Sequence, residues 1–257
     1  MSLNLDRVGR FLAKVEGGNY HNKIVSVTST LDEKDEYAKP FSQLELPNGV
    51  FQQIPDPETE RQILYITGAS GSGKSTYTAN YIKQYKKMFP KNEVYCFSAL
   101  QDDESLDVVN PKRIIVDETI YTSPIEVSEF ANSCVVLDDI DVISDKKIRE
   151  GVYSIMNQIL EVGRHFKITC IITNHLATAG KDTRRVLNEC HSVTYFPFSG
   201  SNVGTKRLLE DYLGLDKHTI GRIKKCKSRW ATCFKNYPTV IMTDKQIWLP
   251  AEDPDLQ

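Results

Sequence analysis

The sequence predicts an α/β fold with a mainly parallel central sheet flanked by helices and a small β-rich extension at the N-terminus. Three observations predict it. From Ile63 onward, short apolar runs of strand length alternate with segments of helical periodicity, which is typical of parallel strands joined by helical crossovers. A glycine-rich turn directly follows the first of these runs. Before it, the first 60 residues hold only short strand-like pieces between turn-rich stretches.

Composition and charge allow one large domain with an extension. The chain has 257 residues, is 40% hydrophobic and carries a formal net charge of −2. It therefore has ample material for a core, and any contact with nucleic acid must come from a local basic patch. We predict an N-terminal extension over residues 1–60, the main domain over 61–250 and a frayed tail over 251–257.

The N-terminal extension has weak signals. Val8, Phe11, Leu12 and Val15 lie at helical spacing, which is typical of a packed helical face and less often of a surface for a membrane or partner. Strand-like pieces follow at 23–27 and 43–46. None of these segments indicates a chemistry.

The cysteines and the hydropathy indicate the compartment. The six cysteines lack C-x-x-C spacing, and several lie in apolar runs; they are Cys96, Cys134, Cys170, Cys190, Cys226 and Cys233. We expect reduced core residues of a soluble intracellular protein. Cys190 and His191 could alternatively gather with Cys226 and Cys233 around zinc, although the spacing differs from common zinc sites. No signal peptide is evident and no apolar run approaches the roughly 18 residues of a membrane span, so no membrane insertion is expected.

The segment Gly68 to Ser75 fits the phosphate-loop (Walker A) spacing G-x-x-x-x-G-K-[ST] without a departure. Its glycines let the backbone turn so that successive N–H groups point at an anion, and the following helix adds the positive end of its dipole. Lys74 is expected to reach the β- and γ-phosphates, and the Ser75 hydroxyl to ligate Mg²⁺. The residues predicted to contact the nucleotide are Gly68, Ala69, Ser70, Gly71, Ser72, Gly73, Lys74, Ser75 and Thr76.

The surroundings of this loop support the prediction. Residues 63–66 in front of it have the pattern of a short buried strand, and 76–87 behind it have that of a helix with three tyrosines on one face. Further strands are expected at 94–98, 113–116, 133–137, 168–173 and 192–196. The stretch 148–162 has the apolar stripe of a packed helix.

Two aspartates follow the apolar strand at 134–137. Carboxylates at the carboxyl end of a buried strand emerge where open α/β sheets bind ligands. Asp138 is expected to hold Mg²⁺ through water beside Ser75, and Asp139 to orient or deprotonate the attacking water. Aspartates after a strand also cap helices, but their position about 65 residues after a complete phosphate loop favours the catalytic interpretation.

A third candidate position ends the next apolar strand, at Asn174 and His175. An amide at this tip could hydrogen-bond the attacking water or the γ-phosphate. Asn after a strand is also a common turn residue. We therefore predict a catalytic role for Asn174 and a weaker one for His175.

Together, residues 68–75, 135–139 and 162–175 resemble the FtsK/HerA superfamily of DNA-pumping ATPases. With the strand at 94–98 and the phrase Asp-Asp-Ile-Asp at 138–141, the chain most resembles the A32-type genome-packaging ATPases of large double-stranded DNA viruses. The resemblance implies a RecA-like (ASCE) P-loop NTPase fold, ATP and Mg²⁺, and a homo-oligomeric ring of five or six subunits around double-stranded DNA. It also implies a capsid or portal partner and a place in the host cytoplasm or the virion. Many relatives carry Asp-Glu where this chain has Asp138-Asp139, and Gln where it has Asn174.

Such ring ATPases commonly need a cation supplied in trans, because the transition state spreads charge over the γ-phosphoryl oxygens. Arg164, just before the strand at 168–173, resembles the family's candidate for this arginine finger. Arg184 and Arg185 are the runners-up. Each could instead be a solvated surface arginine.

The segment from Lys217 to Lys235 has seven Lys or Arg residues and no acid. A helix over about 218–228 would spread them over several faces, which suits a solvated surface as well as a binding surface. The family resemblance favours contacts with DNA phosphates by Lys224, Lys225, Lys227 and Arg229. Strand-like pieces at 230–234, 240–242 and 247–249 then predict terminal β structure.

The predicted function is ATP hydrolysis coupled to translocation of double-stranded DNA into a viral capsid. A nucleotide or small-molecule kinase is the alternative. Such enzymes often begin with the phosphate loop and carry an arginine-rich lid, whereas here a long segment precedes the loop. A GTP-type switch is disfavoured because the sequence has no N-K-x-D motif for guanine selection.

Overall fold

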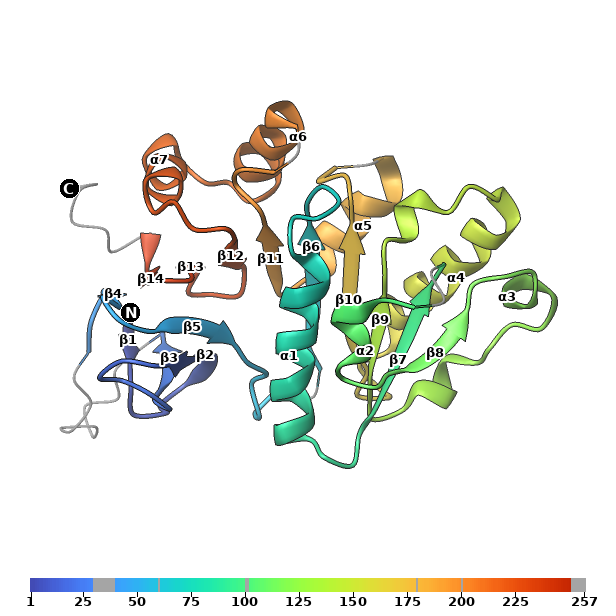
Figure 1. The fold of residues 1–257 in the computed structure, drawn as a ribbon, viewed down its shortest axis with the longest axis horizontal. Coiled ribbons are helices and arrows are strands. Elements are labelled where there is room, and N and C mark those ends of the chain that lie inside the picture. Colours follow the sequence, from blue (N-terminus) through green and yellow to red (C-terminus); the bar gives the residue numbers. More distant parts are fainter. Residues whose placement is uncertain (30–39, 60, 100–101, 179, 200, 251–257) are drawn as a thin grey trace.

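The computed structural model describes residues 1–29, 40–59, 61–99, 102–178, 180–199 and 201–250. Six strands form the parallel half of its main sheet (Figure 1). In spatial order they are β11 (Ser192–Tyr195), β6 (Ile63–Thr67), β10 (Thr169–Asn174), β9 (Ser133–Leu137), β7 (Glu93–Ser98) and β8 (Lys112–Ile115). This order inserts β10 between β6, which leads into the glycine-rich loop, and β9, which leads into the aspartate pair.

Four antiparallel strands extend this sheet beyond β11. They are β12 (Ala231–Phe234), β13 (Val240–Thr243), β14 (Gln246–Trp248) and β4 (Gln43–Glu45), in that spatial order. The predicted terminal β structure is therefore confirmed. The strands predicted after Ile63 are all present within one or two residues of the expected bounds.

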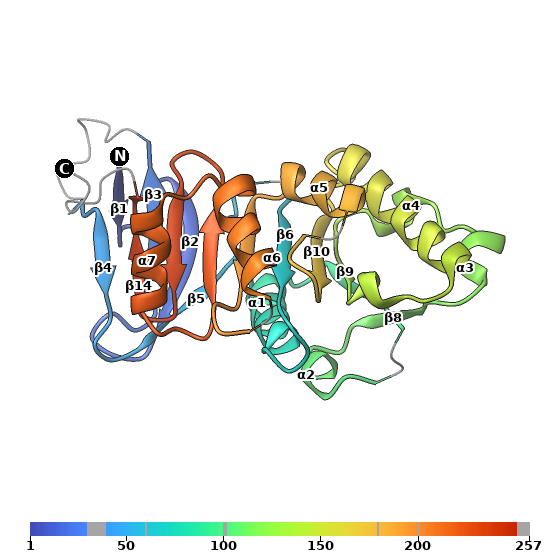
Figure 2. The ribbon, with the colours of Figure 1, turned by 90° about the horizontal axis from the view of Figure 1, so that it is seen from above.

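Helices cover both faces of the parallel half (Figure 2). On one face lie α1 (Lys74–Met88) and α2 (Glu104–Asp107); on the other lie α4 (Lys146–Val162) and α5 (Gly180–Glu189). The two faces have separate cores because strand residues alternate between them. Leu64 and Ile66 of β6 pack with Tyr77, Tyr81 and Tyr85 of α1. Ile63 and Tyr65 of β6 pack on the opposite face. Their partners on α4 are Val152, Ile155, Met156 and Ile159. The helices predicted at 76–87 and 148–162 are confirmed.

The remaining helical segments connect these elements. They are α3 (Thr119–Thr122), η1 (Val127–Phe130), η2 (Ile140–Val142), α6 (Asn202–Arg207), η3 (Leu208–Tyr212) and α7 (Lys217–Lys225). The predicted helix over 218–228 thus ends earlier, because the chain turns there: Lys227 has a left-handed φ of 52° and the Ser228 hydroxyl donates to the Trp230 carbonyl.

The N-terminal extension forms a second, antiparallel sheet in the order β1 (Ser2–Asn4), β3 (Ile24–Thr28), β2 (Arg10–Glu16) and β5 (Val50–Gln53). One apolar cluster joins Leu12, Val25 and Phe51 of this sheet to Val240 and Met242 of β13. The extension is thus packed against the antiparallel end of the main sheet, and its strand β4 belongs to that sheet. The tail predicted at 251–257 lies outside the described residues.

The helical face predicted from Val8, Phe11, Leu12 and Val15 is wrong, because most of this segment is strand β2. A shift in pairing register between Phe11 and Ala13 places Leu12 and Ala13 side by side in the core. Such a bulge interrupts the alternation of a strand. The resulting spacing of buried residues imitates a helix in the sequence.

The cysteines are unpaired, and all except Cys226 are buried. His191 accepts a hydrogen bond from the Ile63 N–H at 2.9 Å through Nδ1, and burial, aided by nearby Arg61, lowers the pKa of His191 to about 4. Within the described ranges, no three Cys, His, Asp or Glu side chains gather in a way that could hold a metal ion. His191 therefore stabilises the start of β6 as a neutral imidazole.

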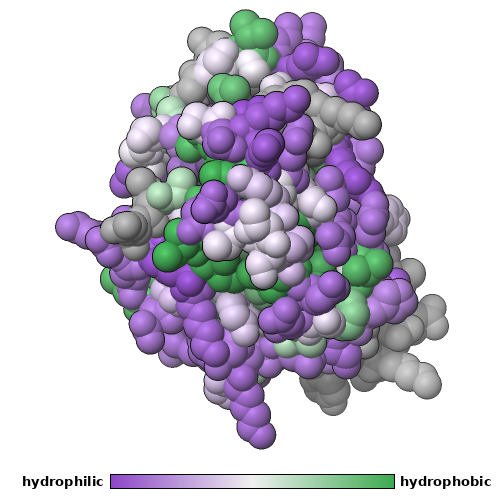
Figure 3. Space-filling view, turned by 90° about the vertical axis from the view of Figure 1, so that its right-hand side faces the viewer, coloured by the Kyte–Doolittle hydropathy of each residue, from purple (hydrophilic) through white to green (hydrophobic). Residues whose placement is uncertain are grey.

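Within the part of the chain that the structure describes, no helix combines the length and apolarity needed to span a membrane. At the opposite end of the molecule from the extension, strand β8 forms the open edge of the sheet, and Ile115 there is 68% exposed. This end is largely hydrophilic with a smaller hydrophobic area near its centre (Figure 3).

Candidate nucleotide-hydrolysis site

The glycine-rich loop lies at the carboxyl end of β6 and leads directly into α1. Gly71 and Gly73 have φ values of 72° and 111°, which residues with a Cβ rarely adopt. Gly73 occupies the N-cap position of α1, where no side chain accepts a hydrogen bond and no acid lies in the first turn. The first N–H groups of this helix are therefore left for an anion, as phosphate binding requires.

Lys74 folds back over this loop and is 6% exposed. Its Nζ donates to the Gly68 carbonyl at 3.0 Å and lies 3.3 Å from Oδ1 of Asp139. The structure thus brings the predicted phosphate-binding lysine against the predicted catalytic aspartate.

Asp138 directly follows the carboxyl end of β9 and is almost completely buried, with 5% exposure. Its carboxylate accepts hydrogen bonds from Thr173 Oγ1 at 2.9 Å and Ser98 Oγ at 3.3 Å. Burial, together with the charge of Asp139, raises the pKa of Asp138. The charged form of this buried carboxylate would be favoured by a nearby cation. A carboxylate and the Ser75 hydroxyl are the hard oxygen ligands that Mg²⁺ prefers, so these residues fit the metal.

Asp139 has a left-handed backbone, with φ 46° and ψ 43°. Its N–H donates to Thr173 Oγ1 at 2.7 Å, and its Oδ2 lies 2.7 Å from His175 Nε2. Although it precedes η2, its side chain makes no capping hydrogen bond. The cap of the following helix α4 is instead Asp145, which accepts from the Ile148 N–H at 3.0 Å. The Asp139 carboxylate therefore faces the loop rather than a helix end.

The two candidates predicted at the end of β10, Asn174 and His175, have side chains with different partners. Asn174 is 2% exposed, and its Nδ2 donates to the Tyr65 hydroxyl at 3.3 Å. Thr173 and His175 instead point to the aspartate pair, because side chains alternate along a strand. Thr173 was not among the candidates predicted from the sequence, yet it forms hydrogen bonds with both aspartates. The period of two along this strand was the signal that could have identified it.

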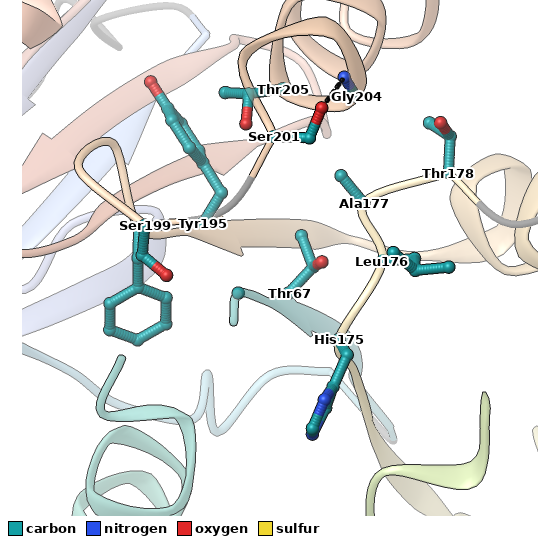
Figure 4. Close-up of a pocket in the computed structure, with 12 residues that line it drawn as sticks. Thr67, His175, Leu176, Ala177, Thr178, Tyr195, Ser199, Ser201, Gly204 and Thr205 are labelled. Carbon is teal, nitrogen blue, oxygen red and sulfur yellow. Dashed lines mark hydrogen bonds between the residues drawn. The ribbon is translucent and has the colours of Figure 1, made fainter. Parts of the chain in front are cut away.

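A third aspartate holds the segment that carries His175. The Asp141 carboxylate accepts the backbone N–H groups of His175 at 2.9 Å and Leu176 at 3.0 Å. Beyond it, a cavity of about 160 Å³ opens above the end of β6. Figure 4 shows this cavity between residues 175–178 on one side and the segment from Tyr195 to Thr205 on the other. His175 thus contacts Asp139 and also lines this cavity.

The sequence has a relative among curated proteins, the uncharacterized protein V3 of Sputnik virophage. The two are 41% identical over 241 residues, which cover 93% of this chain and 95% of the relative. The chain belongs to the V3 family. The relationship to viral proteins that the motifs predicted is thereby confirmed. No protein-family model matches the sequence.

Solved structures share the fold of this V3-family protein. The cytoplasmic domain of the type VII secretion ATPase EccC from Thermomonospora curvata is 11% identical with a TM-score of 0.53, over 84% of this chain and 29% of that one. The pCW3 conjugation coupling protein TcpA is 14% identical with a TM-score of 0.50, over 91% and 76%. These similarities confirm the predicted RecA-like P-loop fold. The genome packaging NTPase B204 from Sulfolobus turreted icosahedral virus 2 aligns over 72% and 98%, with 13% identity and a TM-score of 0.49.

Arg164 lies far from the phosphate loop within this V3-family chain. It is exposed in the turn between α4 and the amino end of β10, whereas the loop lies at the carboxyl ends of the strands. The six residues of β10 separate these ends by roughly 20 Å. Arg184 is exposed on α5, and Arg185 of the same helix pairs with Glu161. Arg164 therefore cannot reach the loop of its own chain from its present position.

The predicted DNA-binding residues of this V3-family chain lie in two different places. Lys224 and Lys225 are exposed in the last turn of α7, and Lys227 is exposed just after it. Arg229 instead lines a cavity beside the phosphate loop, together with Gly73. All four are exposed, but only Arg229 lies beside the phosphate loop, whereas the three lysines lie at and just after the end of α7.

Proposed function

We propose that this V3-family protein hydrolyses ATP to move double-stranded DNA during packaging of a viral genome. The observation that carries the proposal is the convergence of Lys74, Asp138 and Asp139 at one edge of the sheet. A lysine for the phosphates, a buried carboxylate for the metal and a second carboxylate facing the loop are the parts that phosphoryl transfer to water needs.

The contacts suggest how these residues act in turn. The loop N–H groups and Lys74 bind the phosphates, so the Lys74 Nζ must leave Asp139, its partner at 3.3 Å. Ser75 and Asp138 would hold Mg²⁺, which would neutralise part of the negative charge of the phosphates. Asp139, freed from Lys74 and still hydrogen-bonded to His175, then orients the attacking water and accepts its proton.

The choice of DNA as cargo rests on other observations. Two structures that share the fold are named as a conjugation coupling protein and a secretion ATPase, so the fold by itself does not identify what is moved. The motif resemblance to viral packaging ATPases, the virophage relative and the exposed lysines of residues 224–227 support DNA. Packaging places the protein at the viral assembly site in the host cytoplasm or in the virion.

Assembly into a homo-oligomeric ring of five or six subunits would explain the position of Arg164. An exposed arginine at the opposite end of the sheet from its own phosphate loop is available to the loop of a neighbouring subunit. We therefore propose Arg164 as the cation supplied in trans, with Arg184 and Arg185 as the alternatives. A capsid or portal protein would be the further partner.

The test is the ATPase rate of the full chain with and without duplex DNA, across protein concentrations. We expect hydrolysis that DNA stimulates and whose specific activity rises with protein concentration. Hydrolysis that neither DNA nor concentration changes would overturn the translocase proposal. Transfer of the phosphoryl group to a nucleotide or small molecule instead of water would establish a kinase.

A further inference from the structure

A second cavity, of about 260 Å³, lies beside the phosphate loop and is lined in part by Ser72 and Gly73 of that loop. Its walls come from segments far apart in the sequence: β5 of the N-terminal sheet, the first turns of α1, Phe196, the turn before β12 and Asp244. The N-terminal extension therefore forms one wall of a cavity that adjoins the nucleotide site.

The position of this cavity follows the path that a bound nucleotide must take. If the loop cradles the α- and β-phosphates, the nucleoside must lie beside the loop, and this cavity adjoins the loop along the first turns of α1. Thr76 and Asn80, which lie one turn apart on α1, both line the cavity. At the loop itself, a Cβ built on Gly73 would lie 3.4 Å from Phe196 Cε1 and 4.0 Å from Arg229 Nη2. The cavity thus begins where the phosphates end.

Aromatic side chains form its apolar walls. Trp230 packs edge-on against Tyr77 of α1, with ring centroids 5.0 Å apart and an interplanar angle of 73°. Phe196 is 4% exposed, so its ring is held in place by the surrounding core. Rings fixed in this way are suited to contact a planar base, whichever base it is.

Asp244 supplies a polar group that lacks a partner. Its backbone is held on both sides, because its N–H donates to Ser228 Oγ at 3.2 Å and its carbonyl accepts from the Phe51 N–H at 2.9 Å. Within the described ranges, its buried Oδ1 has no hydrogen-bond partner. A buried carboxylate oxygen without a donor is unfavourable. Asp244 lines the cavity, so a turn of its carboxylate towards the cavity would let a ribose hydroxyl or the amino group of a base donate to it.

We propose that this cavity binds the nucleoside half of ATP, with Trp230 against the base and Asp244 accepting a hydrogen bond from the nucleoside. Arg229 lies at the phosphate end of the cavity and contacts the phosphates of the nucleotide instead of DNA. The proposal rests on the proposed ATP-binding function and extends the binding site to the N-terminal sheet and the strands after α7.

Tryptophan fluorescence tests the placement of the base, since the chain has only two tryptophans. ATP should change the emission of the wild-type protein, and tripolyphosphate, which fills the loop without a nucleoside, should not. Trp230→Phe, which retains the fully buried Trp248, should lose the change caused by ATP. A change that persists in Trp230→Phe would overturn the placement.

Equilibrium binding tests the polar contacts. Asp244→Ala should weaken ATP binding by at least about tenfold, the effect of losing a hydrogen bond to a charged group, and leave tripolyphosphate binding unchanged. The analogues 2′-deoxy-ATP and purine riboside triphosphate identify the donor, because the one that lacks it should bind wild type and Asp244→Ala alike. Arg229→Gln should weaken ATP and tripolyphosphate together. Asp211→Ala, at an exposed aspartate of η3, is the control and should change neither.

The cavity assignment and the translocase proposal can be overturned independently of each other. If the wild type hydrolyses ATP with DNA stimulation but Asp244→Ala weakens ATP and tripolyphosphate equally, the cavity assignment is wrong and the translocase proposal stands. If ATP changes the emission of Trp230 and Asp244→Ala is selective for ATP, the cavity assignment stands even where DNA has no effect on hydrolysis.

Discussion

The imidazole Nε2 of His175 lies 2.7 Å from Oδ2 of Asp139, while the other oxygen of that carboxylate faces Lys74 Nζ at 3.3 Å. One carboxylate therefore joins the end of β10 to the phosphate loop. Because Asp139 is 27% exposed, the contacts with Lys74 and His175 define its orientation more than burial does. A nucleotide that attracts Lys74 would leave His175 as the group that holds this carboxylate.

The first prediction concerns the chemical step. Asp139→Asn should still bind ATP, because the loop is unchanged, but it cannot accept a proton from water. Its turnover should fall by about 10²- to 10⁴-fold, the usual contribution of a general base. The measurement is steady-state phosphate release with Mg²⁺, alongside equilibrium ATP binding. Wild-type turnover in Asp139→Asn would falsify the catalytic role.

Lys74→Ala is the companion to that experiment. Removing the ammonium group eliminates the contact with the β- and γ-phosphates, so nucleotide binding or turnover should be lost. Lys83→Ala, an exposed lysine of the same helix α1, is the matched control and should bind ATP as the wild type does. Normal ATP affinity in Lys74→Ala would contradict the assignment of the loop.

The third prediction separates a positioning role of His175 from a catalytic one. His175→Ala leaves Asp139 in place without its partner, so turnover should fall by about tenfold, less than in Asp139→Asn. In the double variant the loss should equal that of Asp139→Asn alone, because residues in one network are not additive. A double-mutant cycle on the rate of hydrolysis measures this. Losses that multiply would mean that His175 acts independently of Asp139.

The raised pKa of Asp138 leads to a prediction about stability. A carboxyl whose pKa is higher in the folded than in the unfolded state favours folding at low pH, and this contribution is lost as pH rises from the unfolded pKa through the folded one. At pH 7 without nucleotide, Asp138→Asn should therefore stabilise the protein, because the variant has no buried carboxylate to leave charged. The gain should shrink as pH falls towards 4, and the added stability from MgATP should disappear. Thermal unfolding at several pH values checks this; a lower melting temperature of the variant at pH 7 would contradict it.

Assembly gives the fifth prediction. If Arg164 acts across a subunit interface, Arg164→Ala and Asp139→Asn subunits should each be slow alone, and their mixture should recover part of the turnover. Arg184→Ala and Arg185→Ala, tested in parallel, show whether another arginine has this role. No recovery in the mixture, together with full activity of a dilute monomer, would eliminate the in-trans arrangement.

The final prediction concerns DNA. Replacing Lys224, Lys225 and Lys227 with Ala should flatten the slope of log affinity against log salt by roughly two to three units, since each phosphate contact contributes about 0.9. Binding should weaken about equally across sequences, and DNA-stimulated hydrolysis should fall while the basal rate is retained. An unchanged salt slope would mean that these lysines form a solvated surface and that DNA binds elsewhere.

The sequence by itself determined the elements whose signals are local. The phosphate loop, the aspartate pair and the buried strands were predicted close to their observed positions, because glycine spacing and continuous apolar runs depend on neighbouring residues. The phosphate-binding chemistry followed from the same short segments. The RecA-like fold was inferred through the resemblance that those segments carry.

Only the tertiary structure decided which residues meet across long separations. Strand β10 lies between β6 and β9, so Thr173 and His175, rather than Asn174, reach the aspartates. The bulge in β2 imitated a helical pattern, and the packing of the extension brings Phe51 against Asp244 and opens the cavity beside Gly73. The alternation of side chains along β10 is a local pattern, but these contacts also depend on strand order and register, which arise from burying three apolar clusters at once and leave no local pattern in the sequence.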